Sequence, residues 1–190
     1  HNFNYKFPQF QSSFADKSDW NSVISSFSED KKGNIWVGSE NHGLYIYNPT
    51  SNSYEKLKDS PVGRIKSIRT DNENRLWVGT LYEGLWLKEN EKLRRIGDIS
   101  GIISTVLPTD DGVWIGNRSG DGALFYNEKQ NTFEYYKENA QDTFSISSNS
   151  IWNIFKDSKG NTWFCSDYGI SVKNKNENHF TNYYKETHHL

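Results

Sequence analysis

Short stretches in which apolar and polar residues alternate run along most of the chain. Leu44-Tyr45-Ile46-Tyr47 and Ala123-Leu124-Phe125-Tyr126 are two of them, and their pattern suits strands with one buried face. No segment combines a helical stripe of apolar residues with capping residues at its ends. The pattern predicts many short β-strands and few helices.

These stretches belong to a repeat that is anchored on tryptophan. An Ile that begins an apolar stretch precedes each anchor by eleven or twelve residues, at Ile24, Ile65, Ile103 and Ile151. The anchors lie 37 to 49 residues apart, in the segments IWVGS at 35–39, LWVGT at 76–80, VWIGN at 113–117 and TWFCS at 162–166. A fixed period of this size indicates a repeat architecture.

Turn residues separate the strands within each copy. Asp30, Asp71 and Asp157 each lie six residues before an anchor tryptophan and are followed by KKGN, NENR and SKGN. Asp, Asn and Gly favour tight turns through local hydrogen bonds and tolerance of positive φ. In the third copy this turn is one residue shorter. We expect a hairpin at each of these places.

Each copy contains material for four antiparallel strands. After the tryptophan strand come a turn ending in Gly, an aromatic strand such as GLYIYN, and a last strand such as SYEKL. Four short strands in about 40 residues correspond to one blade of a propeller. The predicted fold class is therefore an all-β propeller, with blades at about 23–57, 64–97, 102–137 and 150–184. Residues 1–22, with Phe3, Tyr5 and Phe7, are predicted to be the outer strand of a preceding blade and a loop.

Composition restricts the class of protein further. Aromatic residues make up 15% of the 190 residues, which disfavours disorder, and a net charge of -2 without long charged blocks disfavours electrostatic binding of nucleic acid or membranes. The single Cys165 excludes an internal disulfide, and no apolar run approaches the ~20 residues of a membrane span. The absence of Met indicates a piece of a longer polypeptide. Four blades then form either a small closed ring or an arc of a larger ring, and the missing Met favours the arc.

The repeat resembles the two-component regulator propeller repeat. The resemblance rests on D-x-x-G-N-x-W-[VI]-G-[ST] followed by G-L and an aromatic strand, matched best at 26–49 and well at 76–87. The third copy departs from it by its shorter turn and Ala123, and the fourth by Cys165 and Ile170.

The resemblance implies a place in a bacterial sensor protein. Such sensors carry two seven-bladed propellers, a β-sandwich, one membrane helix and a histidine kinase core, often followed by receiver and DNA-binding domains. It implies a periplasmic location, an oligosaccharide ligand, control of glycan-use genes by phosphorelay, and a homodimeric parent protein. Membrane contact would come only through the parent's helix, and this segment would bind no nucleic acid. No kinase motif occurs in the chain, so we expect it to be no enzyme.

The repeated tryptophans and glycines are expected to have structural roles. Tryptophans at one repeated position are more consistent with packing between blades than with sugar stacking, and the glycines mark close approach of neighbouring sheets. Cys165 occupies a glycine position, so we expect a buried small residue there and not a reactive thiol. The anchors are Trp36, Trp77, Trp114 and Trp163 with Gly38, Gly79 and Gly116.

Cofactors and metals are not predicted. Lys31, Lys32 and Lys159 lie beside the repeated aspartates and disfavour calcium, so turn stabilisation is the preferred role of those aspartates. Four of the five histidines, at 42, 179, 188 and 189, are not spaced as a metal site. No nucleophile triad, phosphate loop or paired carboxylate stands out.

Ligand-binding residues are predicted in the loops that follow the tryptophan strands. These positions differ between copies while the turns at the opposite end stay alike, as in a specificity surface, although unconstrained loops would also vary. The candidates are Asn41, His42, Tyr82, Glu83, Arg118, Asp121, Asp167 and Tyr168, with Trp20 and Trp152 as further aromatics near that rim. Two alternatives stay open, a protein-interaction scaffold and a propeller lyase or glycosidase, the latter requiring carboxylates or His at the ring centre.

Overall fold

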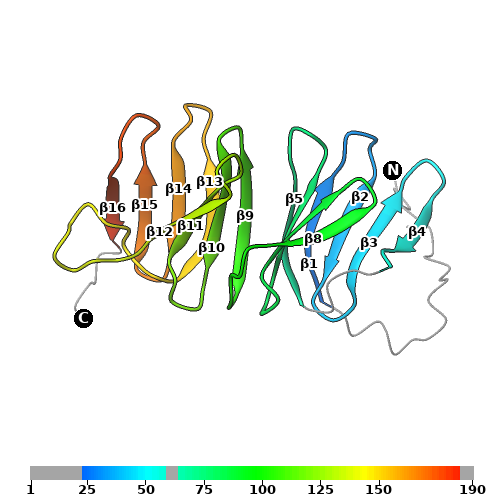
Figure 1. Cartoon of the computed structure of the whole chain (residues 1–190), viewed down its shortest axis with the longest axis horizontal. Coiled ribbons are helices and arrows are strands. Elements are labelled where there is room, and N and C mark those ends of the chain that lie inside the picture. Colours follow the sequence, from blue (N-terminus) through cyan, green and yellow to red (C-terminus); the bar gives the residue numbers. More distant parts are fainter. Residues whose placement is uncertain (1–22, 59–63, 185–190) are drawn as a thin grey trace, which may run out of the picture.

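A computed structural model describes residues 23–58 and 64–184, which form sixteen strands and no helix. The strands form four antiparallel sheets, each built from four strands that are consecutive in the chain (Figure 1). The prediction of an all-β fold with four-stranded antiparallel units is therefore confirmed. The strand predicted within 1–22, Trp20, His188 and His189 lie outside the described residues.

The four sheets follow one another along the chain. The first contains β1 (Ile24–Glu29), β2 (Ile35–Ser39), β3 (Gly43–Asn48) and β4 (Ser53–Lys56). The second contains β5 (Ile65–Thr70), β6 (Leu76–Thr80), β7 (Leu85–Glu89) and β8 (Lys92–Ile96). The third contains β9 (Ile103–Thr109), β10 (Gly112–Asn117), β11 (Ala123–Asn127) and β12 (Thr132–Tyr136). The fourth contains β13 (Ile151–Lys156), β14 (Thr162–Ser166), β15 (Gly169–Lys173) and β16 (Phe180–Tyr184).

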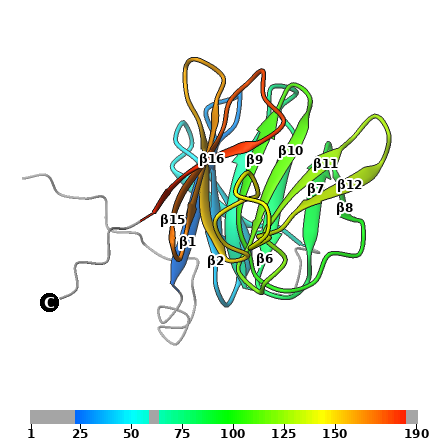
Figure 2. The same cartoon turned by 90° about the vertical axis from the view of Figure 1, so that its left-hand side faces the viewer.

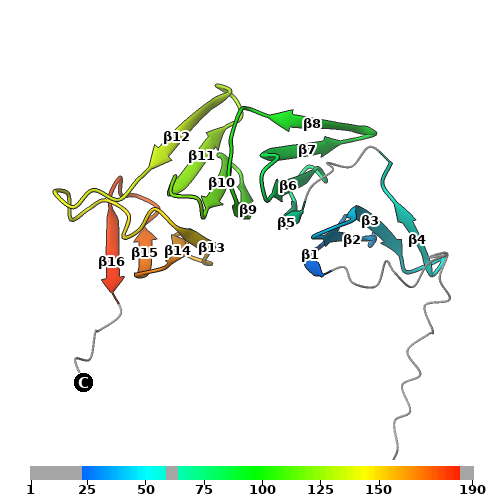
Figure 3. The same ribbon diagram turned by 90° about the horizontal axis from the view of Figure 1, so that it is seen from below.

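The sheets stand side by side in an open arc (Figure 3). The first strands of the sheets, β1, β5, β9 and β13, line its inner side, and each contacts the first strand of the next sheet. The last strands lie on the outer side, and Figure 2 shows the same sheets from one end of the arc. The chain thus passes from the inside to the outside of the arc four times.

Aspartate side chains build the hairpins between the first and second strands. Asp71 Oδ1 accepts hydrogen bonds from the backbone N–H groups of Glu73 and Arg75, both at 2.9 Å. Asp30 and Asp157 make the same two bonds in their own hairpins. Trp77 Nε1 then donates to Asp71 Oδ2 at 2.9 Å, which ties the turn to the anchor tryptophan. The turn interpretation of these aspartates is confirmed.

The sheets approach most closely at the repeated glycines. A Cβ on Gly79 would lie 2.5 Å from Ile103 Cγ2 of the next sheet, and one on Gly38 would lie 2.6 Å from Ile65 Cγ2. Gly116 faces Ile151 in the same way, at 3.0 Å. These distances are below normal van der Waals contact, so a side chain at these positions would push the sheets apart.

Three of the four anchor tryptophans are buried between sheets. Trp77 is fully buried, and Trp36 and Trp114 are nearly so. Trp163 is 37% exposed and Cys165 is also exposed, which corrects the expectation of a buried small residue at that position. Both belong to the fourth sheet, which lies at the end of the arc. Among the described residues, no further sheet covers its free side.

Candidate functional site

The two ends of the sheets carry different kinds of connection. Because each sheet is antiparallel and its strands are consecutive, the β1–β2 type and β3–β4 type hairpins share one end. We call this end the turn face, and it is uppermost in Figure 1. The loops at 40–42, 81–84, 118–122 and 167–168 share the opposite end with the connections between sheets, and we call this end the loop face. All eight candidate ligand residues lie on the loop face.

Each loop on the loop face begins with a polar side chain that folds back onto it. Ser39 Oγ accepts from the backbone N–H of Asn41 and His42, at 3.2 and 3.1 Å. Thr80 Oγ1 accepts from the Glu83 N–H at 2.9 Å and donates to the Gly84 carbonyl. These bonds explain why Ser or Thr follows the repeated glycine, and they fix the backbone that carries the candidate residues.

The candidate residues of the first two loops differ in exposure. Asn41 is exposed and His42 is half-buried. Tyr82 is 69% exposed, whereas Glu83 is half-buried and its Oε2 atom is buried with no hydrogen-bond partner among the described residues. Trp86 Nε1 donates to the Glu83 carbonyl at 3.0 Å, which holds this loop against β7.

The third and fourth loops bring a cation, an aromatic ring and a carboxylate together. The guanidinium carbon of Arg118 lies 3.3 Å from the centre of the Trp152 ring. Trp152 Nε1 in turn donates a hydrogen bond to Asp167 Oδ1. We call Arg118, Trp152 and Asp167 the rim cluster. Tyr168 is exposed beside it, and Asp121, half-buried, pairs with Lys137 Nζ at 3.0 Å.

Charge in the rim cluster is arranged around Asp167. The hydrogen bond from Trp152, a second one from Ser150 and the nearby Arg118 charge lower the pKa of this carboxyl. The Arg118 Nε atom is buried and has no hydrogen-bond partner among the described residues. The cluster therefore offers an ionised acceptor, a cation, and an aromatic ring that is 46% exposed.

At the junction between the first and second sheets, different residues occupy the repeat positions of Arg118 and Trp152. Glu40, like Arg118, lies four residues after an anchor tryptophan, and Lys66, like Trp152, directly follows the leading Ile. Lys66 Nζ and Glu40 Oε1 form an ion pair at 2.6 Å. One repeated position thus joins neighbouring sheets by an ion pair in one place and by a cation and an indole ring in another. The sequence pointed to Arg118 and Asp167, but only the structure shows that Trp152 connects them.

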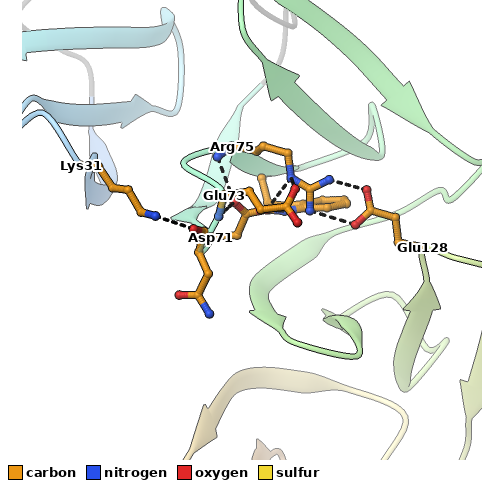
Figure 4. A network of polar contacts seen from close by, with 7 residues as sticks. Lys31, Asp71, Glu73, Arg75 and Glu128 are labelled. Carbon is orange, nitrogen blue, oxygen red and sulfur yellow. Dashed lines mark hydrogen bonds and ion pairs between the residues drawn. The ribbon is translucent and has the colours of Figure 1, made fainter.

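The turn face carries a charged network that sequence reasoning did not identify (Figure 4). Arg75 Nε donates to Asp71 Oδ2 at 2.8 Å, and its two terminal nitrogens donate to both oxygens of Glu128, at 2.5 and 2.8 Å. Lys31 Nζ reaches the Asn72 carbonyl at 2.6 Å. The network links the first three sheets, and its centre is the bidentate pair between the second and third.

The network shifts the pKa values of its members. The bidentate hydrogen bond to Glu128 raises the pKa of Arg75 above its usual value, and the hydrogen bond and charge of Asp71 add to this increase. Burial would raise the pKa of Asp71, but the hydrogen bonds from Arg75 and Trp77 outweigh it and lower that pKa. Both side chains therefore stay charged, and the network stabilises the junction.

Metal sites and membrane spans are absent from what the structure describes. Across 23–58 and 64–184 no three His, Cys, Asp or Glu residues are grouped so that they could hold a metal ion. No helix long and apolar enough to cross a membrane occurs in the same residues.

The repeat anatomy agrees with the comparison to known families. Residues 18–41, 59–82 and 145–168 each match the two component regulator propeller family. The chain therefore carries repeats of this family. The three matches fall on the first, second and fourth copies, and the third copy, with its shorter turn, is not matched. This agrees with the departures seen in the third copy's sequence.

The proteins that the chain matches are much longer than the chain itself. It is 28% identical over 166 residues to histidine kinase P4 of Formosa agariphila, a match covering 79% of this chain and 12% of that protein. It is 25% identical to a solved extracellular domain described as that of hybrid two component system BT3049 of B. thetaiotaomicron, with a TM-score of 0.61, covering 77% and 19% of the two chains. A second such domain, of BT4673, shares the fold at 21% identity and a TM-score of 0.53, covering 81% and 27%.

Proposed function

We propose that this chain is part of the extracellular sensor region of a hybrid two-component histidine kinase and that its loop face binds an oligosaccharide. The matched repeats, the histidine kinase relative and the extracellular domain of BT3049 support the sensor role. The parent protein would be a periplasmic-facing, homodimeric kinase that signals by phosphorelay to genes for glycan use. This chain would contribute ligand contacts and no catalytic group.

The four sheets would be blades of a larger propeller, at about 23–57, 64–97, 102–137 and 150–184. The exposed apolar residues on the two end sheets support this proposal. Phe27 on the first sheet and Phe155 on the fourth are both mostly exposed, and they would pack against neighbouring blades in the parent.

The rim cluster is the observation that carries the ligand proposal. Sugars present hydroxyl groups and apolar C–H faces, so they bind to sites that combine aromatic rings with charged hydrogen-bonding groups. Trp152 offers the ring, Asp167 an acceptor and Arg118 a donor, and two exposed tyrosines, Tyr82 and Tyr168, stand on the same face. Asn41, His42, Glu83 and Asp121 would extend the surface along the arc.

The experiment is a ligand screen on the complete extracellular region that contains this chain. Thermal shift against neutral, acidic and sulfated oligosaccharides, followed by calorimetry, should identify one class that binds saturably. Trp152→Ala should weaken that binding at least about tenfold, because it removes the ring and frees both charged partners. Tyr135→Ala is the control, since Tyr135 is 54% exposed, close to the 46% of Trp152, but lies on the outer strand β12.

Two outcomes would contradict the proposal. One is the absence of binding across the whole panel, together with capture of a protein partner by the same region, which would favour the interaction scaffold. The other is an equal loss of sugar affinity in Trp152→Ala and Tyr135→Ala, which would show that the rim cluster has no special part in binding.

A further inference from the structure

Two clefts open on the turn face, one at each of the last two junctions between sheets. The cleft between the second and third sheets has a volume of about 420 Å³, and the cleft between the third and fourth about 300 Å³. They occupy equivalent places in the repeat, but their charges differ. This difference indicates what the second cleft can bind.

The first cleft satisfies its own charges. Its lining holds Arg75 and Lys129 against five carboxylates, and Arg75 is already paired with Glu128 across the junction. The residue two positions before the anchor tryptophan of one sheet thus meets the turn of the next sheet. This cleft has no excess of cations with which to attract an anion.

In the second cleft both partners of that pair are replaced. Gly112 lies two residues before Trp114, which is the position that Arg75 has relative to Trp77. In the fourth sheet, Lys175 lies at the repeat position that Glu128 has in the third. The ion pair that bridges the first cleft therefore has no counterpart here. Lys175 instead faces the cleft with Lys156 and Lys173.

These three lysines are not closed off by ion pairs among the described residues, although the charges of Glu134 and Glu177 favour the charged form of Lys173. No ion pair involves Lys156, Lys173 or Lys175 in the described part of the chain. Lys173 Nζ donates to the Glu177 carbonyl at 2.5 Å, a neutral acceptor, and burial lowers the pKa of this lysine. Of the two carboxylates in the lining, Asp111 and Glu134, the second accepts a hydrogen bond from Tyr136 at 2.7 Å. The lining therefore holds three lysines against two carboxylates, an excess of one positive charge.

Aromatic rings lie beside the lysines. Trp114 packs against Phe125 and Tyr136, with ring centres 4.9 and 5.1 Å apart, and all three rings line the cleft. Phe125 and Tyr136 are only half-buried, so part of each ring faces the opening. Thr109 and Asn174 add neutral hydrogen-bonding groups. A bare anion would use the lysines alone, whereas a sugar acid would use the rings and neutral groups as well.

We propose that the cleft between the third and fourth sheets binds an acidic saccharide unit, one that carries a carboxylate or a sulfate group. The oxyanion pairs with Lys156, Lys173 and Lys175, the apolar face of the sugar ring packs on Phe125 and Tyr136, and Asn174 and Asp111 bond to hydroxyl groups. Carboxylate and sulfate share the chemistry that these lysines recognise. The site lies on the face opposite the rim cluster and does not depend on ligand binding there.

The test is calorimetric titration of the full 190-residue chain with four small probes: glucose, glucuronate, glucose 6-sulfate and inorganic sulfate. We expect glucuronate or glucose 6-sulfate to bind saturably, at least about tenfold more tightly than either glucose or inorganic sulfate. Which of the two binds better identifies the acidic group. Lys156→Gln and Lys175→Gln should each weaken that binding about tenfold, since a charged hydrogen bond contributes on this scale.

Lys129→Gln is the matched control, because Lys129 is an exposed lysine that lines the neighbouring cleft. It should leave the affinity unchanged, and so should Trp152→Ala in the rim cluster. The proposal is overturned if the acidic sugars bind no better than glucose, if inorganic sulfate binds as tightly as they do, or if Lys129→Gln weakens binding as much as Lys175→Gln. Loss of binding in Trp152→Ala with no effect of the lysine variants would overturn this site and support the loop face.

Discussion

The junction between the second and third sheets and the junction between the third and fourth are held together differently. At the first, Arg75 and Glu128 form a bidentate ion pair across the sheets, above the fully buried Trp77. At the second, aromatic rings from both sheets meet edge to face, with Trp114 and Phe164 centres 5.0 Å apart. Phe180 continues this contact to Tyr136, at 5.6 Å.

The difference shows how one repeat can carry different surfaces. Both junctions share the inner contact between a repeated glycine and the leading Ile of the next sheet. The residues further out are free to vary once that contact holds the sheets together. Where charges pair with each other, the cleft between the sheets is satisfied internally, and where rings replace the pair, three lysines are left to face it.

The largest expected effect comes from breaking the aromatic junction. Phe164→Ala should lower the free energy of unfolding by about 3–5 kcal/mol, because Phe164 is fully buried and its removal leaves a cavity. Phe155→Ala, on the same sheet but 62% exposed, should cost less than about 1 kcal/mol. Urea unfolding of the chain followed by tryptophan fluorescence measures both. Equal losses would show that the rings do not hold this junction.

A smaller effect is expected at the charged junction. Glu128→Gln should lower the free energy of unfolding by about 1–3 kcal/mol, because it leaves the mostly buried Arg75 without its bidentate partner. The control is Glu73→Gln, which alters an exposed carboxylate 3.4 Å from Arg75 Nε and should change stability by less than about 0.5 kcal/mol. Added salt should reduce the gap between the two variants. An equal loss of stability in Glu73→Gln and Glu128→Gln would contradict a stabilising role for the bidentate pair between Arg75 and Glu128.

The smallest effect is a dependence on pH. The pKa of Asp71 is lowered in the folded chain, so its hydrogen bonds contribute stability that is complete above the unfolded pKa of about 3.9. That contribution should be lost as the pH falls below about 4 and through the folded pKa. Asp157 adds to the same trend, since its bond from Trp163 lowers its pKa to about 2.

Asp71→Asn should therefore be less stable than the parent chain at pH 7 and should lose less stability between pH 4 and pH 2. Unfolding curves at several pH values measure the difference, which should be confined to the acid range. Parallel pH profiles for the two proteins would show that the network does not depend on the Asp71 charge.

The local parts of this fold were predictable from the sequence because their interactions span few residues. Asp71 bonds to residues two and four positions further on, and Ser39 to residues two and three further on, so the motif itself contains both partners. The glycines were recognisable because only a residue without a side chain fits against the next sheet. The shorter third turn was also visible in the sequence, and in the structure it is the hairpin in which Gly112 pairs with Thr109.

The chemistry of the surfaces could not be predicted, since its partners are distant in the chain. Arg75 and Glu128 are 53 positions apart, and nothing in either segment indicates the other. Trp152 lies on a strand and Arg118 on a loop of the preceding sheet, and only the packing of two sheets brings them within 3.3 Å. Identical motifs also ended in different environments, because burial depends on the neighbouring sheet. Trp77 and Trp163 occupy the same repeat position, yet the first is buried and the second exposed.

The sequence by itself determined the strands, their turns and the four-fold repeat, because periodicity and turn chemistry act over short distances. The tertiary structure alone decided which side chains meet between sheets, and so where ion pairs close a cleft and where lysines face it. The reason is physical: a sheet junction forms from residues that the chain separates by a whole repeat, and the energies of charge pairing and burial are set there.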